Sequence, residues 1–90
     1  MNGVVFNDLA DYLQHGREIE FRYKGKNYSI TNNQFGWQFC CDTDGTTLRL
    51  CEFREFDVLV DKVKIIEIEG LSIENIFNKQ LGELEILDIL

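Results

Sequence analysis

The chain has 90 residues, enough for one domain over residues 1–90, and its 44% hydrophobic and 12% aromatic side chains can form a core, which argues against disorder. Sixteen Asp and Glu against nine Lys and Arg give a net charge of −7, which disfavours direct binding to nucleic acid or to an anionic membrane. No apolar run approaches the ~20 residues of a membrane span, and the N-terminus lacks the basic region of a signal peptide, so we expect a cytoplasmic protein with reduced thiols.

The first predicted element is a helix over residues 7–15. Asn7 or Asp8 can cap its start, and Gly16 can end it because glycine tolerates a left-handed backbone. Helical spacing places three apolar side chains near one face, namely Phe6, Leu9 and Leu13.

Two predicted hairpins follow. Apolar and polar residues alternate over residues 19–31, with a turn at residues 24–26, and again over residues 37–51, with a tight turn at Asp44-Gly45. Alternation with a period of two predicts one apolar and one polar sheet face. The four strands therefore predict an antiparallel β-meander.

The second hairpin holds all three cysteines and most resembles a chemical site. Cys40 and Cys41 are adjacent, so on a strand they point to opposite faces and cannot easily share a zinc ion. A calcium loop aligned on Gly45 places cysteine at two positions that need oxygen ligands. A Cys-x-x-Cys redox motif is also missing from the sequence. We therefore predict no metal, cofactor or redox site here.

The same hairpin suggests how its side chains divide between core and surface. A turn centred on residues 44–45 pairs Cys40 with Arg49 and places both on the polar face. It also pairs Cys51 with Gln38, so we expect Cys40 and Cys51 to be exposed. The apolar face then holds the core side chains Trp37, Phe39, Cys41, Leu48 and Leu50.

The second half of the chain changes character. Helical spacing predicts a short helix over residues 55–61, and residues 64–70 suggest a short strand or extended link. Ser72 is a plausible cap for a helix over residues 73–80. Alternation in residues 83–90 favours a strand over a helix. The fold class is therefore α+β, an antiparallel β-meander of about four strands plus a possible late strand, with one face covered by two or three short helices.

Catalytic patterns are sparse. His15 is the only histidine, and its place at the end of the first predicted helix favours a capping role over that of a general base. The acidic residues are scattered, and the sequence contains neither a P-loop nor a His-Glu-x-x-His motif. We nominate no catalytic residues, and a small enzyme is the least favoured function.

Three segments, IEFRYKGKNYSI, GWQF and KIIEIEGLSIENIFN, lie within residues 19–78. Their order resembles a group of short uncharacterised proteins of low-GC Gram-positive bacteria and their mobile elements. The resemblance implies a small α+β fold with a curved sheet, and it carries over no activity and no functional residue. The hairpin FCCDTDGTTLRLC departs from the group.

Negative charge is concentrated in the second half of the chain. Residues 46–90 carry ten acids and five cations, against six and four in residues 1–45. We therefore predict a non-catalytic protein-binding module, inhibitor- or immunity-like, that docks on a basic partner protein. The residues expected to bind this partner are Glu67, Glu69, Glu83 and Glu85. The main alternative is a self-associating structural protein that forms a homodimer through an edge strand or the apolar tail ILDIL.

Overall fold

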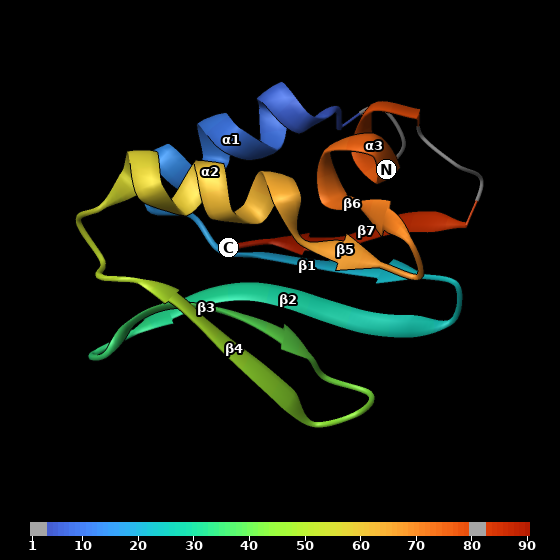
Figure 1. The fold of residues 1–90 in the computed structure, drawn as a ribbon, viewed down its shortest axis with the longest axis horizontal. Coiled ribbons are helices and arrows are strands. Elements are labelled where there is room, and N and C mark those ends of the chain that lie inside the picture. The colour runs from blue at the N-terminus through green and yellow to red at the C-terminus, as the bar shows by residue number, and fades with distance from the viewer. Residues whose placement is uncertain (1–3, 80–82) are drawn as a thin grey trace.

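The structure is a computed structural model, and it describes residues 4–79 and 83–90. A five-stranded antiparallel sheet has the order β4-β3-β2-β1-β7, and β5 and β6 form a separate pair. All three helices lie on one side of the sheet (Figure 1). The elements in chain order are α1 (Phe6–Gln14), β1 (Ile19–Tyr23), β2 (Lys26–Asn33), β3 (Gly36–Cys41), β4 (Thr46–Cys51), α2 (Phe56–Ile65), β5 (Glu67–Ile68), β6 (Leu71–Ser72), α3 (Ile73–Lys79) and β7 (Leu84–Ile89). The predicted α+β meander with a helical layer is confirmed.

The first helix begins slightly earlier than predicted. Its cap residue is Val5, whose backbone N–H donates to Asp8 Oδ2 at 3.1 Å, so neither Asn7 nor Asp8 is the cap. The carboxylate instead accepts from the free N–H before the first turn. The predicted stop is confirmed, because Gly16 follows the helix with a φ of +78°. The predicted apolar face is buried, with Phe6, Leu9 and Leu13 packed on the sheet.

The other two helices follow the sequence pattern closely. α2 is longer than the predicted range of residues 55–61, because Val63 continues the buried stripe one turn beyond Leu59. Ser72 caps α3, since its Oγ accepts from the backbone N–H of Asn75 at 3.2 Å. The predicted end of this helix at Gln80 lies outside the described residues. None of the helices in the described part of the chain is long and apolar enough to cross a membrane.

The β1–β2 hairpin forms as predicted around Lys24 and Gly25. Their φ values are +51° and +79°, the left-handed pair that suits the twist of a two-residue hairpin. Ile19 pairs with Ile30, and the inward residues of β1 are buried. Each hairpin strand therefore supplies one apolar face to the core.

The β3–β4 hairpin has a different register from the predicted one. Cys40 pairs with Thr47 rather than Arg49, a shift of two residues, and Arg49 pairs with Gln38. The cause is a loop over residues 42–45 in place of a tight two-residue turn, closed by Gly45 N–H donating to the Cys41 carbonyl at 2.8 Å. The prediction of this register was therefore wrong.

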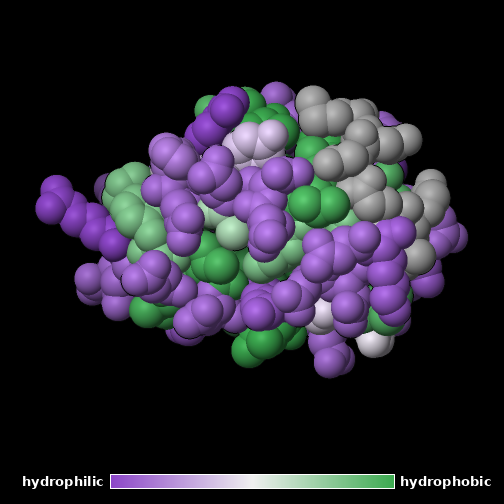
Figure 2. Space-filling view, turned by 90° about the horizontal axis from the view of Figure 1, so that it is seen from above, coloured by the Kyte–Doolittle hydropathy of each residue, from purple (hydrophilic) through white to green (hydrophobic). Residues whose placement is uncertain are grey.

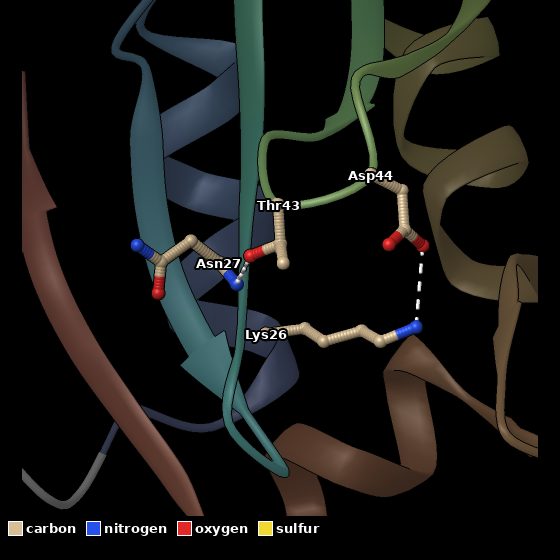
Figure 3. A network of polar contacts seen from close by, with 4 residues as sticks. All are labelled: Lys26, Asn27, Thr43 and Asp44. Carbon is tan, nitrogen blue, oxygen red and sulfur yellow. Dashed lines mark hydrogen bonds and ion pairs between the residues drawn. The ribbon is translucent and has the colours of Figure 1, made fainter.

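Polar contacts to β2 hold this longer loop (Figure 3). Lys26 Nζ lies 3.2 Å from Asp44 Oδ2, and the Asn27 N–H donates to Thr43 Oγ1 at 2.9 Å. The Asn27 carbonyl accepts in turn from the N–H of Asp42 at 2.8 Å. The hydrogen bond to Asp44 raises the pKa of the Lys26 ammonium. Asp42 and Asp44, the two aspartates of the cysteine hairpin, thus help to hold the loop against β2.

A β-bulge corrects the predicted exposure at the end of β4. Trp37 pairs with Cys51 and Gln38 with Arg49, so Leu50 is the extra residue on β4. The bulge turns both Leu50 and Cys51 toward the helices, and each is only 2% exposed. Cys51 was predicted to be exposed, and that prediction was wrong because strict alternation does not survive a bulge.

The core lies between the sheet and the three helices (Figure 1). Trp37 is fully buried there, as predicted, and its Nε1–H donates to the Phe53 carbonyl at 3.0 Å. The tail forms β7, antiparallel to β1, which confirms the predicted late strand. The sheet consequently has two edges, β4 and β7.

Candidate protein-binding surfaces

The three cysteines are free thiols that do not converge. Cys40 is partly exposed on the outer sheet face, where its Sγ lies 3.7 Å from Thr47 Oγ1. Cys41 and Cys51 are buried on the helical side, at opposite ends of the β3–β4 ladder. Burial, and then the nearby charge of Glu55, raises the pKa of the Cys51 thiol, which lowers its reactivity. Among residues 4–79 and 83–90, no cluster of His, Cys, Asp or Glu could hold a metal ion.

His15 is the C-cap residue of α1. Its Nδ1 lies 2.8 Å from the Asp11 carbonyl oxygen and 3.6 Å from Asp11 Oδ1, and both side chains are exposed. These are the contacts of a helix terminus, in keeping with the predicted capping role.

The four glutamates predicted to bind a partner are all exposed, namely Glu67, Glu69, Glu83 and Glu85. Three of them gather where β1 ends: Glu69 Oε2 lies 3.7 Å from Lys24 Nζ, and the Glu83 carbonyl accepts from the Lys24 N–H at 3.4 Å. Glu85 Oε2 lies 3.7 Å from Arg22 Nη1. Glu67 begins β5, two residues before Glu69. Two of the four charges are thus offset by neighbouring cations, so the surface is less negative than predicted.

A groove of about 510 Å³ lies at the opposite end of the molecule, between the β2–β3 turn and the link from β4 to α2. Figure 2 shows apolar side chains interrupting the hydrophilic surface near the end where β4 leads into α2. Phe35 is 68% exposed in this groove and Phe53 is 42% exposed. We call it the aromatic–arginine groove, and its walls are Gln34, Phe35, Gly36, Arg49, Glu52, Phe53 and Arg54.

Local geometry fixes the two phenylalanines. The Asn33 Oδ1 accepts from the Phe35 N–H at 2.8 Å, which sets the turn. Gly36 has a φ of +107°, and a Cβ there would lie 2.2 Å from the Cys51 carbonyl oxygen, so only glycine lets the turn approach β4 this closely. Phe53 stacks on Trp37, with ring centroids 5.9 Å apart. The Phe53 ring and the backbone of the turn that carries Phe35 are therefore held in place before any partner binds.

The arginines of the groove carry unpaired charge. Arg49 Nε donates to the Phe35 carbonyl at 3.1 Å, which holds its guanidinium against the β2–β3 turn. Neither Arg49 nor Arg54 forms an ion pair within the described chain, although Glu52 and Glu55 are close in sequence. Glu55 Oε1 instead accepts from the Glu52 N–H at 3.0 Å. The groove thus holds two arginine charges against the single carboxylate of Glu52, on an otherwise acidic protein.

Side chains occupy the β7 edge of the sheet at Ile89. The Ile89 carbonyl accepts from Arg17 Nη2 at 3.3 Å, and the Ile89 N–H donates to Asp88 Oδ1 at 2.9 Å. Arg17 also lies over the Tyr12 ring, 5.5 Å from its centroid, so α1 helps to place it. Both backbone groups of Ile89 are consequently occupied without a neighbouring strand.

The β4 edge is covered only at its C-terminal end. Lys62 Nζ donates to the Leu50 carbonyl, and Cys51 Sγ lies 3.6 Å from the Glu55 carbonyl. Residues 46–49 are all exposed, and no hydrogen bond reaches their backbone from described residues outside β3. Leu48 is 54% exposed, which corrects its predicted place in the core: the hairpin projects beyond the helical layer.

The sequence contained a signal for the groove that was missed. Phe35 is an aromatic residue in an otherwise polar turn, next to a glycine, where it cannot reach the core of its own hairpin. Phe53 likewise lies outside the predicted helix of residues 55–61; it precedes α2 and remains partly exposed. The wrong β3–β4 register hid the position of Arg49: the four-residue loop places it opposite Gln38, where its Nε reaches the Phe35 carbonyl.

Comparisons of the chain with protein-family models, with curated proteins and with solved structures gave no match.

Proposed function

We propose that this protein is a non-catalytic protein-binding module whose main contact surface is the aromatic–arginine groove. One observation carries the proposal: the exposed rings of Phe35 and Phe53 lie beside Arg49 and Arg54, whose charges have no carboxylate partner in the described chain. Aromatic and arginine side chains are enriched at the centres of protein interfaces. A cytoplasmic location, in keeping with three free thiols, is part of the proposal.

The energetics favour coverage of this surface by a partner. Burial of a phenylalanine side chain is worth roughly 1.5–3 kcal/mol relative to exposure. Phe35 leaves most of that gain unused in the free protein. Because the turn, the Trp37 stack and the Arg49 hydrogen bond already order much of the groove, this protein would lose less side-chain entropy when a partner docks.

Site-directed photocrosslinking tests the proposal. A photoreactive phenylalanine analogue at Phe35 should crosslink to a discrete protein in extracts of the source cells, and Arg49→Glu should abolish the adduct. The same analogue at Ile65 is the matched control, because Ile65 is 72% exposed but lies at the end of α2, outside the groove. Equal labelling from both positions, or adducts that persist with Arg49→Glu, would contradict the proposal.

The acidic residues favour a second contact, with a basic partner surface. Glu67 and Glu83 are exposed and form no ion pair within the described residues, unlike Glu69 and Glu85. Complementary charge would speed association and make it salt-dependent. The test is binding of the crosslinked partner to a variant in which all four glutamates become lysine. If the partner binds this variant as tightly as the wild type at low salt, the proposed acidic contact is excluded.

A further inference from the structure

The bare part of the β4 edge runs directly into the aromatic–arginine groove. Residues 46–49 are all exposed, their backbone has no hydrogen bond outside β3 among the described residues, and Arg49 belongs to both the edge and the groove. An edge strand turns the N–H and C=O groups of alternate residues outward, where an added strand can pair with them. Edge and groove therefore form one continuous surface.

We infer that the groove receives an extended peptide segment of a partner protein, which adds as a strand to β4 and carries a carboxylate next to a branched apolar side chain. This inference rests on the proposed function and names its partner. Strand addition supplies main-chain hydrogen bonds, and alternate side chains supply the specificity.

The pleat of β4 sets the order of side chains in such a segment. Arg49 pairs with Gln38 on the outer sheet face, whereas Leu48 pairs with Phe39 on the helical side. A strand beside β4 follows the same alternation. A residue that contacts Arg49 is consequently followed by one that contacts Leu48, which is 54% exposed. The segment thus needs a carboxylate and an apolar side chain at adjacent positions.

The chemistry of Arg49 selects the carboxylate. Its Nε is bound to the Phe35 carbonyl, and its terminal N–H groups have no carboxylate partner in the described chain. A guanidinium held in one orientation matches the two oxygens of a carboxylate. Arg54 adds a second positive charge to the same groove.

A partner segment fits this surface better than a second copy of the chain. Two copies would each carry a net charge of −7, and their mutual repulsion opposes close pairing. A short segment with one carboxylate carries little charge outside the groove. On the β7 edge, Arg17 and Asp88 occupy the backbone groups of Ile89, so that residue is not free to pair with an added strand.

The probe is a capped ten-residue peptide that alternates threonine and valine, with one central threonine replaced by glutamate. It is titrated into the isotope-labelled full chain, and amide chemical shifts are followed. Shifts should centre on residues 46–49, and the affinity should fall about tenfold when lysine replaces the glutamate or with Arg49→Gln. N-methylation of alternate peptide residues should abolish binding, because it removes the N–H groups that pair with β4.

Three outcomes would overturn the inference: equal binding of the glutamate and lysine peptides, shifts centred on β7, or no shift at millimolar peptide. A fourth contradicting outcome would come from sedimentation of the protein alone. If the protein forms a dimer that Leu48→Lys dissociates, β4 pairs with β4 of a second copy rather than with a partner segment. If a partner crosslinks at Phe35 but the peptide causes no chemical-shift changes in β4, the proposed function stands and only strand addition is rejected.

Discussion

The two edges of the sheet differ in where side chains cover their backbone groups. On β7, Arg17 and Asp88 bind both backbone groups of Ile89, so that edge offers less to an incoming strand. On β4, Lys62 covers only the Leu50 carbonyl, and residues 46–49 remain bare beside an exposed Phe35. Exposed edges invite unwanted pairing, and proteins usually blunt them. This difference between the β4 edge and Ile89 of β7 is the observation on which the proposed strand addition to β4 rests.

The largest predicted effect concerns the contact that joins β4 to the β2–β3 turn. Gly36→Ala should lower the free energy of unfolding by about 3 kcal/mol or more, because its Cβ would overlap the Cys51 carbonyl at a positive φ. Gly25→Ala is the matched control: it also has a positive φ but meets no atom within 4 Å, so it should cost about 1 kcal/mol. Equal losses in urea unfolding would contradict the close approach.

The covered end of β4 depends on α2. Lys62→Met keeps the length of the side chain but leaves the Leu50 carbonyl without its donor, and should cost about 1.5 kcal/mol. Lys64→Met removes only an exposed pair with Glu74, 3.5 Å long, and should cost about 0.5 kcal/mol or less. Urea unfolding measures both, and a reversed order would show that Lys62 does not cover this edge.

Removing the side-chain contact to Ile89 should promote self-association through the β7 edge. Arg17→Ala frees the Ile89 carbonyl, so sedimentation should reveal self-association about tenfold tighter than that of the wild type, a change of about 1.4 kcal/mol. Arg22→Ala also removes an exposed arginine, but one that pairs with Glu85 within the sheet, and it should not promote association. Identical sedimentation of the two variants would mean that Arg17 does not guard the edge.

Alkaline pH should weaken the covered end of β4. Burial raises the pKa of the Cys51 thiol above that of the unfolded chain, so unfolding releases a proton once the pH passes the ordinary thiol value of ~8.5. This contribution to stability is complete below that pH and is lost as the pH rises toward the folded pKa. Cys51→Ala should therefore flatten the decline of unfolding free energy on the alkaline side. A slope unchanged by Cys51→Ala, or changed equally by Cys40→Ala, would contradict this assignment.

The smallest effect lies beside the β7 edge. Glu20 and Asp88 are paired across β1 and β7, where facing like charges are unfavourable, so Glu20→Gln should stabilise the fold by about 0.5 kcal/mol. Glu85→Gln should do the reverse by a few tenths of a kcal/mol, because it breaks the exposed pair with Arg22. Thermal unfolding at low salt checks both signs, and high salt should erase the difference.

Local sequence signals predicted most of the fold. The stripe of α1, the Ser72 cap and the strand alternation each depend on near neighbours, and all three appear in the structure. The register of the β3–β4 hairpin could not be predicted in the same way. It depends on contacts from Lys26 and Asn27 to the loop and on a bulge, which are tertiary features.

The candidate site was less predictable than the fold, for the same reason. Phe35, Arg49 and Phe53 come from different elements, and the observed β3–β4 register brings Arg49 to the groove that all three line. The acidic residues were visible as charges, but the cations Lys24 and Arg22 that offset two of them come from β1 and its turn. Charge counts along the chain do not reveal such pairings.

Residue-resolved amide hydrogen exchange tests the contrast between the two edges most directly. We predict that the Ile89 amide is protected in the free protein, while outward-facing amides among residues 46–49 exchange about as fast as exposed loops and become protected when the glutamate peptide binds. Slow exchange along all of β4 in the free protein, or protection of β7 alone on peptide binding, would contradict the account.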